Sequence, residues 1–488
     1  MASEKQAENE HRAGPGSDAF RAFMASGWTP RTPAPAPRSE AAAWAARRRT
    51  ALTGRFPGER LVIPAGGLKV RSNDTDYPFR PHTAFAYLTG LGAEAEPDSV
   101  LVLDHHGATL YFRPPAPRDS AEYFADSRHG EFWVGPRPGT EEIESRLGLG
   151  AAHLDSLPDA LAKDTDPARI RVLRSADPDV AAIVDRLRVD GPARLPEADA
   201  ELDRHLSTVR LVKDEWEIGE MRSAVAATHR GFDAIIEALP EAVARGRGER
   251  WVEGVFGLHA RHQGNGIGYD SVCAAGDHAN TIHWQKNTGE VRPGELILID
   301  AGVEVDSLFT ADITRTLPVG GRFSDAQREV YEAVLAAQEA GLAAVKPGNR
   351  FRDIHAAAIR VIAERLHGWG LLPDGVTVEQ TLDAENGGWH RRWMVHGTSH
   401  HLGMDVHDCA LLRRDDYLDG ELLPGMILTV EPGLYFKADD QLAPERFRGI
   451  GVRIEDDVLV TADGHENLSA AMPRTAADVE SWVSGLAK

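Results

Sequence analysis

Five side chains in the second half of this 488-residue sequence are of types that hold metal ions: Asp300, Asp312, His400, Glu431 and Glu455. Asp300, Glu431 and Glu455 each follow a short apolar run that is typical of a buried strand. Charged side chains are rarely buried unless they are paired or bound to a metal. Because four neighbouring carboxylates would repel one another, divalent cations are the natural compensation. The set therefore predicts a metal-dependent hydrolase.

The spacing of the two aspartates indicates a hairpin. Asp300 and Asp312 lie twelve residues apart, with the apolar run 296–299 before the first of them. A strand, a turn and a returning strand would bring the two carboxylates side by side. We expect the two acidic residues between them, Glu304 and Asp306, to face solvent near the turn.

One histidine and four carboxylates form a hard, oxygen-rich donor set. Such a set favours Mn²⁺, with Co²⁺, Fe²⁺ or Zn²⁺ as substitutes. Bridging carboxylates would hold two ions about 3.5–4 Å apart. A pair of ions at that separation would lower the pKa of a bridging water, yield hydroxide near neutral pH and polarise a substrate carbonyl.

Histidines are concentrated around the predicted metal ligand His400. His396, His400 and His407 fall within twelve residues, next to the small residues Gly397 and Gly403. A single histidine is usually structural, but three in so short a segment are difficult to explain as core filler. A more distant histidine, His283, carries a weaker signal, because it would serve equally well to cap a strand.

Three segments resemble the Xaa-Pro aminopeptidase (aminopeptidase P) branch of the pita-bread metallopeptidases, a group that also includes prolidase, methionine aminopeptidase and creatinase. They are residues 396–408, 430–435 and 449–457. Residues 73–80 resemble the creatinase-type amino-terminal domain of the same family, and the whole resemblance covers about residues 60–480. One departure from the family pattern is a loop between the two aspartates that is one residue longer.

The resemblance implies that the same five side chains bind a dinuclear metal centre, and it implies roles for four further residues. His283 would line the substrate site near the scissile bond, His396 would contact the substrate and help stabilise the developing oxyanion, and His407 would hold the proline carbonyl side. Arg453 would support the ligands and the catalytic histidine. Glu431 would pass a proton from the bridging water to the imide nitrogen of proline.

The expected substrates are peptides that begin with Xaa-Pro, whose scissile bond is a tertiary amide without an N–H. A prolidase, which cleaves only Xaa-Pro dipeptides, would use the same ligands and is the alternative. A non-catalytic scaffold is disfavoured, because all five ligands are present. Methionine aminopeptidase is disfavoured by the long amino-terminal domain.

The predicted elements indicate an α+β fold with a domain over 205–485, preceded by a smaller mixed α/β domain over 41–195. The resemblance implies that the larger domain is a pita-bread catalytic domain. Residues 61–63, 100–103, 109–112 and 170–173 are expected to form strands of the first domain. Helices are expected over 41–52, 214–239, 324–346 and 352–366, two of them opened by capping boxes at Asp214 with Glu217 and at Ser324 with Gln327. We expect a linker over 187–200. Residues 1–40 are predicted to be a disordered or extended arm, or a segment docked on a neighbouring subunit.

The composition limits the classes of partner. Lys and Arg number 54 and Asp and Glu 75, so the net charge is −21, which disfavours nucleic acid and anionic membranes. Cys273 and Cys409 are too few for a disulfide framework or a cysteine-rich zinc site. With neither an apolar stretch long enough to span a bilayer nor a secretory signal, we expect a cytoplasmic protein. The family resemblance implies a homodimer or homotetramer.

Overall fold

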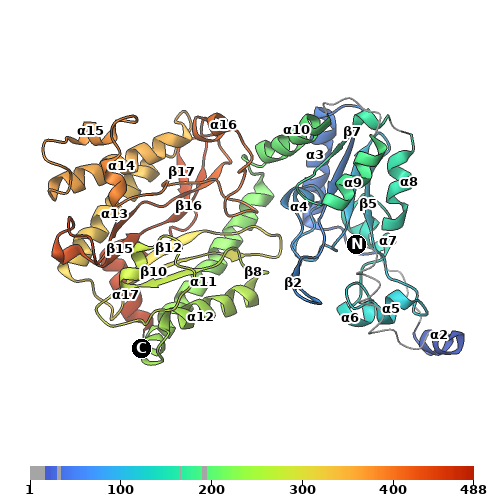
Figure 1. The fold of residues 1–488 in the computed structure, drawn as a ribbon, viewed down its shortest axis with the longest axis horizontal. Helices are drawn as coiled ribbons and strands as arrows, with labels where there is room; N and C mark the ends of the chain where they lie inside the picture. The colour runs from blue at the N-terminus through green and yellow to red at the C-terminus, as the bar shows by residue number, and fades with distance from the viewer. Residues whose placement is uncertain (1–16, 30–34, 165, 189–194, 488) are drawn as a thin grey trace. The chain divides into compact units, whose positions relative to one another are not determined.

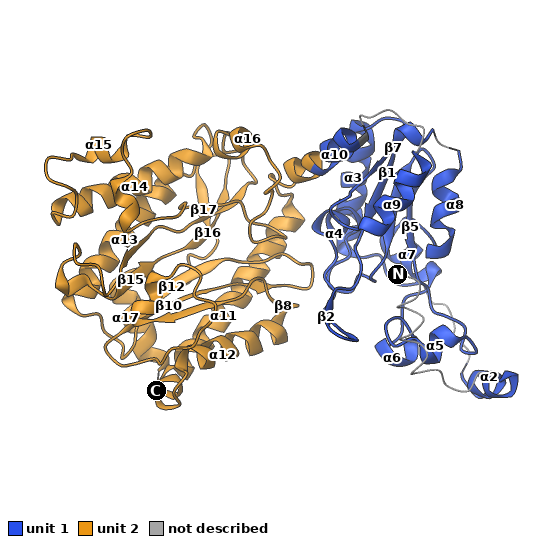
Figure 2. Cartoon of the chain, in the orientation of Figure 1, with its two compact units in different colours: residues 1–203 blue, residues 204–488 orange. Residues whose placement is uncertain are grey.

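The computed structural model describes residues 17–29, 35–164, 166–188 and 195–487. The chain divides into two compact units, residues 1–203 (unit 1) and residues 204–488 (unit 2) (Figure 2). Helix α10 (Leu195–Val209) spans this boundary. Among the described residues, no helix combines the length and the apolar character needed to cross a membrane.

Unit 1 is built on a five-stranded mixed sheet in the order β6-β5-β4-β1-β7. Strand β1 pairs antiparallel with the central strand β4 and parallel with the edge strand β7, and a separate hairpin joins β2 to β3. The strands are β1 (Arg60–Pro64), β2 (Val70–Ser72), β3 (Thr75–Asp76), β4 (Val100–Asp104), β5 (Gly107–Phe112), β6 (Gly150–His153) and β7 (Ile170–Val172). The helices are α2 (Asp18–Ala25), α3 (Glu40–Arg55), α4 (Thr83–Thr89), α5 (Ala121–Ala125), α6 (Glu131–Val134), α7 (Thr140–Leu147), η1 (Leu154–Ser156), α8 (Leu157–Ala162), η2 (Pro167–Arg169) and α9 (Pro178–Leu187).

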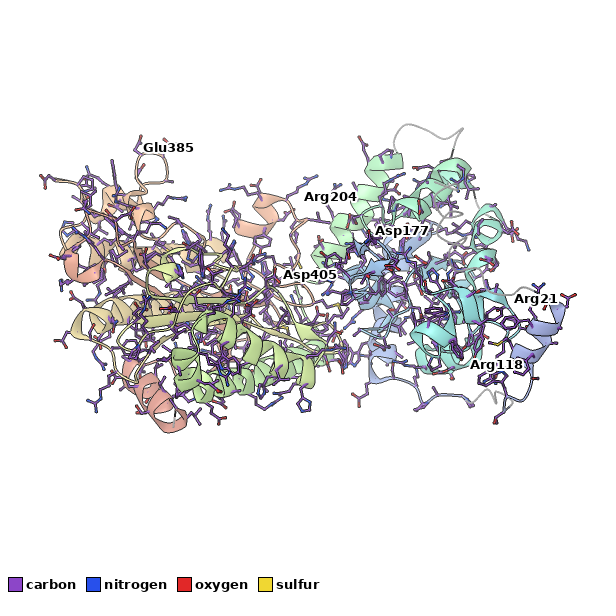
Figure 3. The ribbon with its side chains drawn as sticks, turned by 60° about the horizontal axis from the view of Figure 1, so that its bottom comes forward. Arg21, Arg118, Asp177, Arg204, Glu385 and Asp405 are labelled. Atoms are coloured by element: carbon purple, nitrogen blue, oxygen red, sulfur yellow. The ribbon has the colours of Figure 1, made fainter. Side chains whose placement is uncertain are left out.

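The four strands and the helix predicted for this unit are confirmed as β1, β4, β5, β7 and α3. The prediction of a disordered or extended amino-terminal arm was wrong at Asp18–Ala25, because these residues form helix α2. Apolar contacts stabilise this helix, since Phe20 packs edge-on against Phe124 with ring centroids 5.4 Å apart. Arg118 lies near the helix (Figure 3), with its guanidinium 4.5 Å from the Trp28 ring. Residues 1–16 and 30–34 of the expected arm lie outside the described residues.

Unit 2 places strands at its centre between helices α11 and α12 and helices α13 and α14 (Figure 1), which confirms the predicted α+β architecture. The helices are α11 (Glu215–Ala244), α12 (Gly248–Gln263), η3 (Gly276–Asn280), α13 (Asp325–Ala344), α14 (Phe351–Gly368), α15 (Val378–Leu382), η4 (Trp389–Arg392), α16 (Arg414–Leu418), η5 (Glu445–Phe447) and α17 (Ala476–Leu486). Both predicted capping boxes are present. Cys273 and Cys409 are buried free thiols.

The strands of unit 2 form sheets in the orders β12-β10-β9, β11-β8, β13-β16-β17 and β14-β15. They are β8 (Gly266–Ile267), β9 (Val272–Ala275), β10 (Leu296–Ala301), β11 (Val303–Glu304), β12 (Ile313–Pro318), β13 (Ile427–Val430), β14 (Gly433–Phe436), β15 (Ile450–Arg453), β16 (Asp456–Val460) and β17 (His465–Asn467). A fully buried ion pair, Arg315–Asp456 at 2.7 Å, connects β12 to β16. This pair joins two sheets whose strands carry predicted metal ligands at their ends.

Three further predictions were wrong. Helix α11 does not end at Leu239 but continues past Pro240 to Ala244, although an internal proline removes a helical hydrogen bond and crowds the carbonyl one turn earlier; the buried Ala242 packs the extra turn against the core. The expected linker over 187–200 overlaps the start of α10 at Leu195, and residues 189–194 lie outside the described residues. Glu304 is buried rather than solvent-facing, because Asn265 donates a hydrogen bond to its carboxylate at 2.7 Å. Asp306 is exposed, as expected.

Candidate metal centre

The β10–β12 hairpin positions the two aspartates. Asp300 pairs with Thr314 in the antiparallel register, and Asp312 lies two residues before Thr314. Side chains alternate along a strand, so Asp300, Asp312 and Thr314 share one face. The return of the chain requires glycine at position 302, because a Cβ there would lie 1.6 Å from the carbonyl oxygen of Ala311. The hairpin therefore delivers both carboxylates to the same place.

The two glutamates come from the ends of other strands. Glu431 follows β13, and its N–H donates to the carbonyl oxygen of Thr398 at 2.8 Å. Glu455 lies between β15 and β16, where its N–H donates to the carbonyl oxygen of Thr314 at 3.1 Å. The Thr314 hydroxyl donates to Glu455 Oε2 at 2.6 Å, so strand β12 holds both the backbone and the carboxylate of Glu455.

His400 reaches the carboxylates from a segment without regular secondary structure. Its Nδ1 lies 3.2 Å from the carbonyl oxygen of His401, so Nδ1 carries a proton and Nε2 is the nitrogen that faces the carboxylates. Nε2 lies 3.1 Å from Asp312 Oδ2 and 3.8 Å from Glu431 Oε1. One ligand atom each from Asp312, His400 and Glu455 lie within 4.8 Å of one another. A histidine held by its other nitrogen is the usual arrangement for a metal ligand.

Burial leaves much of the negative charge uncompensated. It raises the pKa of Glu455 well above its usual range, raises the pKa of Asp300, and raises the pKa of Glu431 to about 7. Burial acts the same way on Asp312 and is the largest single effect there, but the hydrogen bond and charge of His400, the hydrogen bond from Tyr269 and the charge of Arg453 together outweigh it, so the pKa of Asp312 is lowered. Burial opposes the charged form of His400 as well, yet Asp312 and Glu431 raise its pKa to about 9. Divalent cations fit this donor set, since they supply the missing positive charge.

Arg453 connects the carboxylates to His396 through a tyrosine. Its guanidinium donates to Asp300, to the Thr314 hydroxyl at 3.1 Å and to the Tyr435 hydroxyl at 3.2 Å. The Tyr435 hydroxyl lies 2.7 Å from His396 Nε2, while His396 Nδ1 donates to the carbonyl oxygen of Gly397 at 2.6 Å. Burial, followed by the nearby charge of Arg453, lowers the pKa of His396 to about 3. His396 is therefore a neutral imidazole, with Nδ1 lying 3.6 Å from Glu431 Oε2.

The remaining predicted residues lie at the margin. His407 is exposed, and its ring meets that of His400 edge-on with centroids 4.6 Å apart. The loop between these two histidines carries Asp405, whose side chain is labelled in Figure 3. His283 is exposed in a turn after η3. It is close enough to lower the pKa of both His396 and His407, although burial is the main cause in each case.

Two tyrosines of the site escaped the sequence analysis. The Tyr269 hydroxyl contacts Asp312 and lies 2.7 Å from Asp300 Oδ1, between the two carboxylates. Nothing in its local sequence singles it out, because its contacts depend on how the segment after α12 crosses the hairpin. Tyr435 belongs to the motif 430–435, but only the structure connects it to Arg453 and His396.

Comparison with known proteins supplies the family. Residues 219–462 match the model of metallopeptidase family M24, and residues 45–172 match that of the aminopeptidase P N-terminal domain. The chain belongs to metallopeptidase family M24. The resemblance predicted from the motifs and the pita-bread fold class are thereby confirmed.

The relatives of this M24 chain match it along nearly its whole length. It is 50% identical over 475 residues to "Xaa-Pro aminopeptidase 1" of Streptomyces coelicolor, covering 96% of this chain and 93% of that protein. The solved aminopeptidase PepP of Pseudomonas aeruginosa superposes with a TM-score of 0.79 at 30% identity, covering 92% of this chain and 99% of that one. Zinc-substituted aminopeptidase P of Escherichia coli, solved with product, gives a TM-score of 0.78 at 29% identity, covering 93% and 100%.

Proposed function

We propose that this protein is a metal-dependent aminopeptidase that hydrolyses the bond between the first residue and proline in peptides beginning Xaa-Pro. The observation that carries the proposal is the convergence of Asp312, His400 and Glu455, with Asp300 and Glu431 beside them, in a chain of which 96% aligns with an Xaa-Pro aminopeptidase. A scaffold protein would have no use for this buried, mutually repelling set of acids.

In our proposal, Asp300, Asp312, His400, Glu431 and Glu455 hold two divalent ions, with Mn²⁺ preferred. When bound, the ions supply Lewis acidity at the scissile carbonyl and lower the pKa of the attacking water. Hydrogen bonds within the chain would orient these ligands for the metal. Tyr269 and Arg453 donate to Asp300, and Thr314 donates to Glu455.

The other side chains handle the substrate and the proton. Glu431 accepts a proton from the attacking water and delivers it to the proline nitrogen, which has none of its own. His396, fixed by Tyr435 and lying beside Glu431, contacts the substrate next to the developing oxyanion. His407 and His283 are exposed at the margin, where they can contact the substrate on the proline side and near the scissile bond respectively.

Three peptides test the proposal. Purified, chelator-treated protein is incubated with Arg-Pro-Pro, Gly-Pro or Arg-Ala-Ala, with and without Mn²⁺. Metal-dependent cleavage of Arg-Pro-Pro alone, or of Arg-Pro-Pro and Gly-Pro, is expected. Cleavage of Gly-Pro alone would make the protein a prolidase, and no cleavage at full metal occupancy would favour a scaffold.

Three finer points belong to the same proposal. Activity measured after reloading with Mn²⁺, Co²⁺, Fe²⁺ or Zn²⁺ tests the preference for manganese. Light scattering in solution tests the expected homodimer or homotetramer, and cell fractionation tests the expected cytoplasmic location.

A further inference from the structure

A buried glutamate far in sequence from the metal ligands organises the segment that carries His283. Glu249 lies on α12 with its side chain fully buried. Its Oε1 accepts hydrogen bonds from the Ala275 N–H at 2.8 Å and from His278 Nδ1 at 2.7 Å. Its Oε2 accepts from Trp284 Nε1 at 2.8 Å and from the Gly289 N–H at 2.5 Å. A carboxylate has about four acceptor positions, so all of them are used.

All four donors belong to one segment, residues 275–289. It begins at the last residue of β9, contains the short helix η3 and has no regular secondary structure after η3, so N–H groups such as that of Gly289 depend on side-chain acceptors. His283 stands near its middle, directly before Trp284. The Trp284 ring is held twice, by its bond to Glu249 and by stacking on His278 with centroids 3.9 Å apart. Fixing Trp284 in this way fixes the backbone of His283.

Glu249 and Gly289 exchange hydrogen bonds in both directions, and the space between them is tight. The Glu249 N–H donates back to the carbonyl oxygen of Gly289 at 3.2 Å. A Cβ on Gly289 would lie 2.7 Å from Glu249 Cδ and 2.7 Å from His278 Nδ1, so any larger residue would displace the carboxylate. Asn287 secures the same end of the segment, since its amide donates to Ser271 O at 2.9 Å and accepts from the Cys273 N–H at 3.0 Å.

We propose that Glu249 is a positioning residue for the hydrolytic reaction, acting through the 275–289 segment to hold His283 in place against the substrate. The inference rests on the proposed function, in which His283 contacts the peptide near the scissile bond. Packing alone does not explain a buried carboxylate that accepts four hydrogen bonds. An apolar side chain of similar size would fill the same space without the free-energy cost of removing a charge from water. A small displacement of a substrate-contacting group is enough to lower turnover strongly.

The test is a double-mutant cycle of Glu249→Gln with His283→Ala, measured as kcat/KM on Arg-Pro-Pro at full metal occupancy. Glutamine keeps the shape of the side chain, but its NH₂ replaces two acceptor positions with donors that face other donors. We expect E249Q alone to lower kcat/KM by about tenfold or more. In the H283A background the further loss should be less than about twofold, because residues that act as a unit are not additive.

Hydrogen exchange followed by mass spectrometry tests, without any assay of activity, whether Glu249 holds residues 275–289 in place. E249Q should speed exchange in residues 275–289 and leave strand β10 protected. Glu253→Gln is the matched control: Glu253 lies one turn further along α12 and makes no hydrogen bond among the described residues, so both readouts should match the wild type. Gly289→Ala, which displaces the carboxylate from the other side, repeats the cycle if E249Q does not fold.

The outcomes separate the inference from the function on which it rests. Losses that multiply in the double variant, or an E249Q enzyme as active as the wild type, would overturn the role of Glu249 while the peptidase assignment stands. A wild-type enzyme without Xaa-Pro hydrolysis would overturn the proposed function itself. An H283A variant with wild-type kcat/KM would remove the role given to His283, and the inference with it.

Discussion

Replacing Arg315 with methionine should remove a large part of the stability of unit 2. Its fully buried guanidinium donates to the carboxylate of Asp456 and to four backbone carbonyl oxygens, those of Thr314, Glu455, Met472 and Pro473. Breaking a buried pair by removing one partner costs about 3–5 kcal/mol. Asp456 keeps hydrogen bonds from Ser469, Gln338 and Asn467, so the lower end of that range, about 3 kcal/mol, is expected.

Urea unfolding measures this loss through tryptophan fluorescence, because seven of the ten tryptophans lie in residues 204–488. With a slope of about 3 kcal/mol per molar urea, the midpoint should fall by about 1 M. Arg446→Met is the control: its ion pair with Glu329 is exposed, and such pairs contribute less than about 1 kcal/mol. A midpoint for R315M as close to the wild type as that of R446M would refute the reasoning.

The remaining predictions concern the metal site and unit 1. Glu431→Ala and His400→Ala should each abolish peptide hydrolysis while circular dichroism stays unchanged; normal activity in either would refute the ligand assignment. Deleting residues 1–38 should leave hydrolysis of small peptides largely unchanged, and a loss of activity would mean that the arm helps to build the site. Hydrogen bonds to Asp126 and then Asp98 raise the pKa of His129 to about 9. The stabilisation from this raised pKa is fully present below about pH 6.5, the pKa of the histidine in the unfolded chain. It is lost as the pH rises through about 9, the pKa in the folded protein. Thermal melting should therefore show His129→Gln less stable than wild type at pH 6, with the difference vanishing by about pH 10; a pH-independent difference would contradict this.

The sequence determined the elements of this protein because their signals are local. Alternating or continuous apolar runs marked β1, β4, β5, β7 and β10, and side-chain caps marked the start of α11 and α13. Local signals failed where a boundary depends on distant contacts. Helix α2 formed in a segment whose composition favours disorder, because Phe20 finds Phe124 about a hundred residues away.

The same distinction applies to the candidate site. The types and spacing of Asp300, Asp312, His400, Glu431 and Glu455 were sufficient to predict a metal centre, since few other arrangements explain acids at the ends of buried strands. The sequence could not predict which groups orient the predicted ligands. Tyr269 and Arg453 both donate hydrogen bonds to Asp300, but they lie 31 and 153 positions away from it in the chain. The role of Glu249 could not be predicted from the sequence either. A glutamate on a helix is usually a solvent-exposed charge, and only the folded structure shows that four donors bury this one. The sequence therefore determined the types of the predicted ligands, whereas tertiary packing decided their orientation, because it alone brings distant donors and acceptors within bonding distance.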